Sequence, residues 1–296
     1  MISRLKLEWQ TILLAVLIYA LFGFVTRYYH SLPGWFVFII GGYVVAWHGS
    51  LRHEAVHMHP TTSEQLNELL VLPSLDLYLP FRLYAQTHTK HHINQNVTDP
   101  ELDSESFYLS EKRWNALPLI RQWSYWIFHT LAGRLLLYPF WMIPYFWFDE
   151  AQRLARGDIR NLQAWTWHLL GITLTMSWVI GVCGIPLWEY LLLFVYPGTS
   201  LTLLRSFAEH RSHPDWEGRS AILEAEYLFG ILYLYNNFHA LHHNNPYVPW
   251  YKLPSLFRQE REKLLERNNN YLICGYSELF LKYLISPKEI PYLLNR

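Results

Sequence analysis

Four apolar stretches of the chain each approach the length of a membrane span. They cover approximately residues 11–27, 34–51, 164–182 and 186–204. A bilayer-spanning helix needs roughly 20 apolar residues. Turns with proline and glycine, Ser31 to Gly34 and Gly184 to Pro186, separate the members of each pair. A cleaved signal peptide is the alternative for the first stretch, but no small-residue cleavage site is clear and a second span follows at once. The pattern predicts four transmembrane helices.

The segments between and after these spans are mixed in character. Leu66 to Leu79 is apolar but interrupted by Pro73 and Asp76, which favours a helix at the membrane interface. Trp123 to Phe148 is aromatic but broken by prolines, which favours an interfacial helix pair. Residues 255–270 have the charge pattern of a surface helix, and the aromatic tail from Tyr271 is expected to pack on the membrane face.

The distribution of basic residues gives these spans an orientation. With four spans, residues 1–10, 51–163 and 205–296 lie on one side and hold 23 of the 24 Lys and Arg residues, whereas the other side holds only Arg27. Positive charge gathers on the cytoplasmic side of a membrane. The sequence therefore predicts an all-α integral membrane protein that is a single domain over 1–296. Its cytoplasmic helical cap is made of 52–163 and 205–296, and both termini are cytoplasmic.

Composition agrees with a membrane protein and excludes several other classes. The 14 Trp, 21 Tyr and 16 Phe residues suit aromatic belts at the membrane interfaces. A formal net charge of zero gives no sign of a nucleic-acid partner. The two cysteines, Cys183 and Cys274, form no CxxC pair, so neither a disulfide framework nor a thiolate metal site is expected.

Histidines repeat at a spacing that suits metal binding. His88-Thr-Lys-His91-His92 and His239-Ala-Leu-His242-His243 share the pattern HxxHH, and His53-Glu-Ala-Val-His57 precedes them. Positions i, i+3 and i+4 lie on one face of a helix, so the imidazoles of each motif can converge. Two copies of HxxHH argue against coincidence. Predicted topology places all three motifs in the cap.

Eight histidines exceed the coordination number of one metal ion, so the motifs predict two metals. A shell of imidazoles with open positions suits iron that meets oxygen. Carboxylates near the ligands can accept the second ring N–H and fix the tautomer; the candidates are Glu54, Asp99, Asp103 and Glu209.

The order HxxxH, HxxHH, HxxHH between paired spans resembles the membrane fatty acid desaturase and hydroxylase superfamily. Arg205-Ser-Phe-Ala-Glu-His210-Arg and Asn236-Asn-Phe-His239-Ala-Leu-His242-His243, followed by Pro249-Trp-Tyr-Lys-Leu-Pro254, are similar to bacterial members. The resemblance covers about residues 35–254. It implies a non-haem di-iron centre in a cytoplasmic cap on four transmembrane helices.

The resemblance also implies a set of metal ligands. They are His53, His57, His88, His91, His92, His210, His239, His242, His243 and, linked to iron through water in many members, Asn236. His213 competes with His210 for the ligand between the last span and the last motif. Five histidines match no motif: His30, His48, His59, His129 and His168.

This resemblance implies an oxygen-dependent desaturase of a fatty acyl chain or related lipid, with two Fe as cofactor and O2 as co-substrate. A lipid or carotenoid hydroxylase with the same iron site is the close alternative. The sequence contains no CxxC and no GxGxxG, so electrons are expected from a separate ferredoxin, rubredoxin or cytochrome b5 type of donor.

Two other classes of protein compete with this interpretation. His53-Glu54-Ala-Val-His57 also satisfies HExxH, the pattern of zinc metalloproteases in which the glutamate is the general base. That alternative leaves both HxxHH copies unexplained. A membrane metal transporter or sensor would place ionisable residues inside the spans, and these spans contain few.

Overall fold

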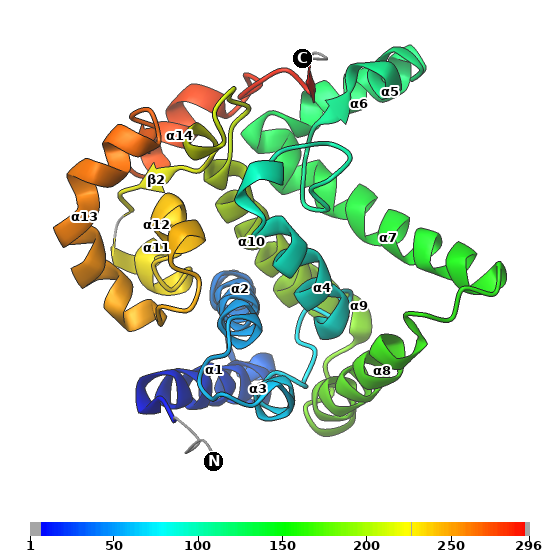
Figure 1. Ribbon diagram of the computed structural model, residues 1–296. Coiled ribbons are helices and arrows are strands. Elements are labelled where there is room, and N and C mark those ends of the chain that lie inside the picture. Colours follow the sequence, from blue (N-terminus) through cyan, green and yellow to red (C-terminus); the bar gives the residue numbers. More distant parts are fainter. Residues whose placement is uncertain (1–6, 226, 294–296) are drawn as a thin grey trace. The chain divides into compact units, whose positions relative to one another are not determined.

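The computed structural model describes residues 7–225 and 227–293, which are mostly helical (Figure 1). Its α-helices are α1 Trp9–Arg27, α2 Gly34–Val56, α3 Glu64–Leu70, α4 Phe81–His91, α5 Glu111–Asn115, α6 Leu119–Phe128, α7 Tyr138–Ala155, α8 Leu162–Met176, α9 Leu187–Tyr190, α10 Tyr196–Glu209, α11 Tyr227–Leu232, α12 His239–Asn244, α13 Leu253–Arg267 and α14 Tyr276–Tyr283. Short helical turns are η1 Tyr29–Ser31, η2 Asn94–Asn96, η3 Gly133–Leu137, η4 Ser177–Val182, η5 Leu191–Val195, η6 Trp216–Arg219 and η7 Trp250–Lys252. Two-residue strands form two parallel pairs, β1 Leu109–Ser110 with β4 Tyr292–Leu293 and β2 Ile222–Leu223 with β3 Leu272–Ile273.

The chain forms two compact units, each built from separated stretches. Unit 1 comprises residues 1–85 and 139–202, and unit 2 comprises 86–138 and 203–296. These boundaries differ from those expected for spans and cap, because residues 52–85 and 139–163 belong to unit 1. The single domain over 1–296 stays a prediction.

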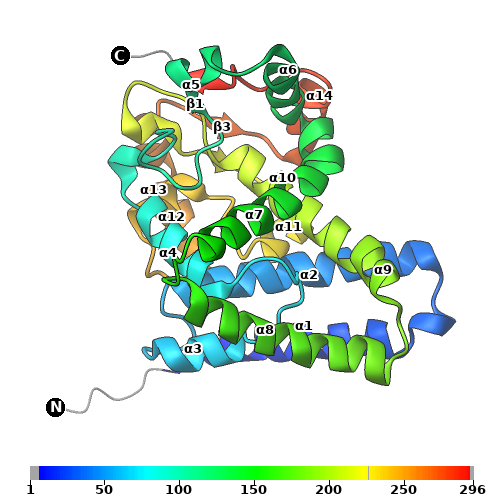
Figure 2. The same ribbon diagram turned by 90° about the vertical axis from the view of Figure 1, so that its right-hand side faces the viewer.

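Unit 1 contains long apolar helices that pack at close range. α2 packs on α1, and Figure 2 shows these two helices side by side. α2 also packs on η5. The contact needs small residues, because a Cβ on Gly42 would lie 2.6 Å from Pro197 and a Cβ on Gly198 would lie 2.6 Å from Val45. Glycine at such positions lets two membrane helices approach closely.

Three helical stretches of the described residues are long and apolar enough to cross a membrane: Trp9–Arg27, Gly34–Val56 and Leu187–Glu209. They agree with three of the four predicted spans, and two of them run about five residues further than expected. The predicted span 164–182 is helical as α8 and η4, but His168 and three tryptophans lower its mean hydropathy. The fourth span and the cytoplasmic cap stay predictions.

Polar side chains of unit 1 satisfy the backbone of an irregular segment, residues 71–80. His168 Nε2 lies 3.2 Å from the Leu77 carbonyl oxygen, and the Tyr190 hydroxyl donates to the Leu75 carbonyl at 2.7 Å. Arg52 pairs with Asp76 and donates to the Leu79 carbonyl. Buried backbone oxygens need such partners, which explains polar residues in otherwise apolar helices.

Unit 2 has its own core beneath the last histidine motif. Ala240 and Leu241 of α12 pack with Ile222 of β2 and with Leu253, Phe257 and Leu264 of α13. The predicted surface helix over 255–270 is confirmed as α13, whose buried side chains are the apolar ones of this core. Because Ala240 and Leu241 face the core, the opposite face of α12 carries His239, His242 and His243.

Candidate metal centre

Four histidines of unit 2 bring their Nε2 atoms together. His210 Nε2 lies 3.0 Å from His91 Nε2 and 2.9 Å from His239 Nε2, and His243 Nε2 lies 3.0 Å from His239 Nε2. One ligand atom of each ring lies within 4.8 Å of those of the other three. Metal–imidazole bonds of about 2.1 Å place neighbouring ligand nitrogens roughly 3.0 Å apart when they meet at right angles. The spacing therefore fits four ligands of one ion.

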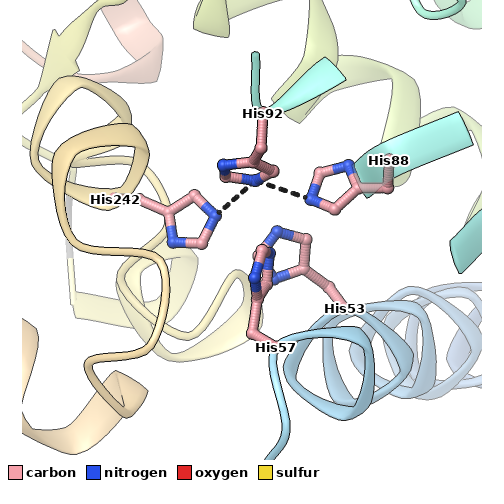
Figure 3. Close-up of side chains that lie close together, drawn as sticks. All are labelled: His53, His57, His88, His92 and His242. Carbon is pink, nitrogen blue, oxygen red and sulfur yellow. Dashed lines mark hydrogen bonds between the residues drawn. The ribbon is translucent and has the colours of Figure 1, made fainter. Parts of the chain in front are cut away.

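Three further histidines of unit 2 adjoin this group. His92 Nε2 lies 3.0 Å from His88 Nε2 and 3.2 Å from His242 Nε2, and Figure 3 shows these three rings pointing toward one another. The rings of His92 and His243 stack with centroids 4.4 Å apart, which joins the two sets. We call His88, His91, His92, His210, His239, His242 and His243 the seven-histidine cluster.

The HxxHH spacing acts as predicted in both copies. α4 ends at His91, so His88 and His91 are helical and His92 follows directly, whereas α12 contains all three histidines of its motif. His210 comes from no motif: it directly follows α10 and forms an isolated antiparallel bridge with Ser220. Lys288 Nζ also donates to the His210 carbonyl oxygen at 2.6 Å, which fixes this irregular segment.

Carboxylates stand behind several of these rings. Asp103 accepts a hydrogen bond from His91 Nδ1 at 3.0 Å, and Glu209 Oε1 lies 3.3 Å from His239 Nδ1. The contact of Asp103 agrees with the role predicted for it, whereas Glu209 lies beside the His239 ring without a hydrogen bond to it. Glu105, which the sequence analysis missed, accepts from His88 Nδ1 at 3.1 Å. A proton on Nδ1 leaves Nε2 with its lone pair directed at the neighbouring ligands.

The two remaining predicted carboxylates lie in different surroundings. Asp99 accepts the backbone N–H groups of Glu101 and Leu102 within a turn. Glu54 is buried, with its Oε1 3.9 Å from His53 Nδ1, and its role beside the first motif stays a prediction. Position along the chain thus did not distinguish Asp103, which accepts from a histidine ring, from Asp99, which accepts from the backbone.

Burial keeps most of these imidazoles neutral. It holds the pKa of His210, His239 and His243 well below the ordinary histidine value. Burial, with His88 and His91 nearby, lowers the pKa of His92 to about 2. Burial acts in the same direction on His91, but Asp103 and Glu105 outweigh it and leave the pKa of His91 raised.

This donor set fits metal ions. Metals bind the neutral imidazole, and several crowded Nε2 lone pairs without a cation would repel one another. His91 already donates from Nδ1 to Asp103, and a single proton on His210 Nε2 cannot bridge to both His91 Nε2 and His239 Nε2. Divalent cations placed among the rings would satisfy the lone pairs that protons leave.

His53 and His57 lie in unit 1 at the C-terminal end of α2, with ring centroids 4.7 Å apart (Figure 3). Both are buried. α2 runs without a break from the predicted second span through this motif to Val56. The HxxxH spacing therefore places both rings on one face of that helix, as expected.

Other candidates are located as follows. His213 Nδ1 contacts the backbone of Asp215, and His213 belongs to neither group of convergent ligand atoms among the described residues. Asn236 is buried in the turn that leads into α12; its role stays a prediction.

The histidines outside the motifs have other partners. His59 pairs with Glu8, His48 contacts Tyr19, His30 and His168 contact backbone carbonyls, and His129 contacts the Tyr125 carbonyl. That these five histidines bind no metal stays a prediction.

The chain also matches a known protein family. The profile of the fatty acid desaturase family matches residues 29–274, which include every histidine motif. A comparison with curated proteins gives no match. On the extent of the family match, the chain belongs to the fatty acid desaturase family.

Proposed function

We propose that this protein is an oxygen-dependent di-iron desaturase that introduces a double bond into a fatty acyl chain or related lipid. Family membership implies an oxidoreductase with a lipid or acyl substrate in a membrane setting. The observation that carries the finer proposal is the convergence of His91, His210, His239 and His243 on one small volume. The adjoining His88, His92 and His242 provide donors for a second ion.

The proposed ligand set adds three residues to the seven-histidine cluster. His53 and His57 would complete the ligands of the second ion, and Asn236 would act through water. Nine histidines are more than one ion can bind, which supports two ions. When bound, iron with two external electrons would supply the oxygen activation that removes two hydrogens from adjacent carbons.

The chain's own residues would position this chemistry. Asp103 and Glu105 hold the tautomers of His91 and His88 through Nδ1, and Glu209 lies against Nδ1 of His239. Such partners orient ligand rings and raise their basicity. The overall balance consumes O2, two electrons and two protons, and yields two waters and the double bond. We propose a separate ferredoxin, rubredoxin or cytochrome b5 type of donor for the electrons.

We also propose that both termini and the metal centre lie on the cytoplasmic side, which the distribution of Lys and Arg supports. A hydroxylase would use the same ligands, since the outcome depends on whether the substrate radical loses a second hydrogen or gains oxygen. The HExxH protease alternative does not account for the family match or for the carboxylates behind the cluster.

The test is lipid mass spectrometry of cells with and without the protein, together with elemental analysis of the purified chain. We expect a lipid two mass units lighter than its precursor and iron near two equivalents per chain. A product sixteen units heavier would show the hydroxylase. One zinc without iron would contradict the proposal.

A further inference from the structure

One face of α6 exposes large apolar side chains. Leu119, Ile120, Trp123 and Ile127 follow the helical repeat, and Ile120 and Trp123 are 76% and 65% exposed. Such an apolar face seldom remains in contact with water, and it marks an interaction surface.

A second exposed apolar group lies at the end of α14. It consists of Phe280, Leu281, Leu284 and Ile285, and Leu281 and Ile285 are 88% and 83% exposed. Backbone hydrogen bonds tie this end to the segment after α6: Ala132 donates to the Leu284 carbonyl and Lys288 donates to the His129 carbonyl, both at 2.9 Å. We call the eight side chains, Leu119, Ile120, Trp123, Ile127, Phe280, Leu281, Leu284 and Ile285, the α6–α14 patch.

The patch adjoins the end of a helix that is long and apolar enough to cross the membrane. That helix, Leu187–Glu209, enters unit 2 at Leu203. Tyr283 of α14 contacts Phe207, with ring centroids 6.2 Å apart, and Lys288 Nζ donates to the Phe207 carbonyl at 2.7 Å. All these contacts lie within unit 2. The exposed apolar side chains are therefore carried by elements that pack where this helix ends.

The composition around the patch suits a lipid headgroup region. Two exposed cations adjoin the patch along the chain: Arg121 follows Ile120, and Lys282, which pairs with Glu278 of the same helix, follows Leu281. Trp123 lies among the apolar side chains of α6. Tryptophan and basic residues beside an apolar helix face are typical of segments that lie in the interface plane. Basic residues there also attract anionic lipids.

We propose that the α6–α14 patch is an interfacial membrane-binding surface, which inserts into the headgroup and upper acyl region of a phospholipid bilayer. It would attach unit 2 to the membrane in addition to the spanning helices. This proposal depends on the exposed side chains and on their link to Leu187–Glu209, and it holds whatever reaction the metal centre performs.

The test uses the full chain in vesicles of phosphatidylcholine with a minority of phosphatidylglycerol. Nitroxide labels are placed at Ile120→Cys and Leu281→Cys in a Cys274→Ser background, because Cys274 is the exposed cysteine and Cys183 is buried. Glu262→Cys on the charged face of α13 is the aqueous control, and Leu13→Cys on α1 is the lipid control; both positions are exposed. Spin relaxation is measured with molecular oxygen, which enters lipid, and with a water-soluble nickel chelate.

We expect the labels at positions 120 and 281 to resemble the Leu13 control, with strong relaxation by oxygen and little by nickel. Relaxation by nickel as strong as at position 262 would show that the patch faces water and would overturn the proposal. Protection from both reagents would show a protein neighbour, such as a second copy of the chain, and would also overturn it. The readout needs neither iron nor activity, so it is independent of the proposed desaturation.

Discussion

At the scale of single residues, carboxylates hold rings of the seven-histidine cluster in place. Asp103 and Glu105 lie two residues apart and accept hydrogen bonds from the rings of His91 and His88, respectively. Asp103 also accepts the backbone N–H of Thr98 at 2.8 Å and that of Glu105 at 2.9 Å. These backbone bonds fix the short turn that contains Asp103 and Glu105, and this turn holds the Nδ1–H tautomers of His91 and His88.

We predict that Glu105→Ala weakens iron binding by about 10–100-fold, the usual cost of losing a carboxylate that orients a ligand histidine. The residue no longer accepts from His88 Nδ1, so that ring can rotate and exchange its proton. Competition with a chelator measures the affinity, and iron per chain is measured alongside. Glu101→Ala is the matched control, because Glu101 pairs with Arg113 on the surface. Glu105→Gln keeps an acceptor oxygen, so its iron affinity should lie between those of the two alanine variants. Equal iron affinities for Glu105→Ala and Glu101→Ala would contradict this role.

Asp103 and Glu105 also show which contacts the sequence does not predict. The HxxHH spacing predicted that the three histidine rings of α12 share one side of the helix, because a helix face is a local property of the sequence. Glu105 lies 17 residues beyond His88, and its contact depends on how the intervening turn folds. The position of His210 is similar: the bridge to Ser220 and the Lys288 bond hold it beside His91, and neither contact has a local sequence signal. Which of His210 and His213 binds metal stays a prediction.

At the scale of elements, the close packing of α2 determines where the first motif lies. α2 continues for 23 residues from Gly34 to Val56, so the motif His53 to His57 is a direct extension of an apolar helix. Its glycines permit contact with the helix that leads to Glu209. The apolar runs predicted the existence of these helices, but their ends were underestimated, because charged residues near the ends form ion pairs rather than marking a boundary. Arg52 is buried beside Asp76, and Arg205, which is partly buried, pairs with Glu209.

We predict that Gly42→Ala lowers stability by about 1–3 kcal/mol, the range for overpacking. The added Cβ would lie 2.6 Å from Pro197 Cβ, and the rigid pyrrolidine ring cannot turn away. Gly23→Ala in α1 is the control, since a Cβ there meets nothing within 4 Å; it should be neutral or stabilising by up to about 1 kcal/mol. Thermal unfolding in detergent compares the two. If the unfolding midpoint temperature of Gly42→Ala were equal to or higher than that of Gly23→Ala, α2 would have to shift to accommodate the added methyl group.

At the scale of the whole molecule, the hydropathy pattern and the histidine motifs together specified a helical membrane protein of the fatty acid desaturase family, which the family match confirms. The segment 164–182 shows why hydropathy does not determine the number of spans. Its His168 contacts the Leu77 carbonyl oxygen within residues 71–80. A buried polar residue with a structural partner lowers hydropathy without changing the fold, and composition alone cannot distinguish it from one at a surface.

The enzyme class of the whole molecule can be tested at Glu54, because a zinc protease and a di-iron desaturase would use this residue differently. Glu54 is buried beside His53, and HExxH would make it the base of a zinc protease. In that class its loss is close to fatal to the chemistry, because the base activates water. In a di-iron desaturase it is at most a partner of a ligand ring, where loss costs about 10–100-fold.

We therefore predict that Glu54→Gln, which keeps the size of the side chain but removes its charge and basicity, retains bound iron and measurable oxygen-dependent conversion of a lipid. Iron per chain and lipid product are measured in the same preparation, with His243→Ala as the variant expected to lose both. The assay is repeated without oxygen and without reductant, and each omission should stop product formation, since both electrons and O2 enter the balance. Product that continues under argon would exclude an oxygenase whatever the metal content, and complete loss of conversion in Glu54→Gln with iron retained would assign this carboxylate a direct part in the reaction.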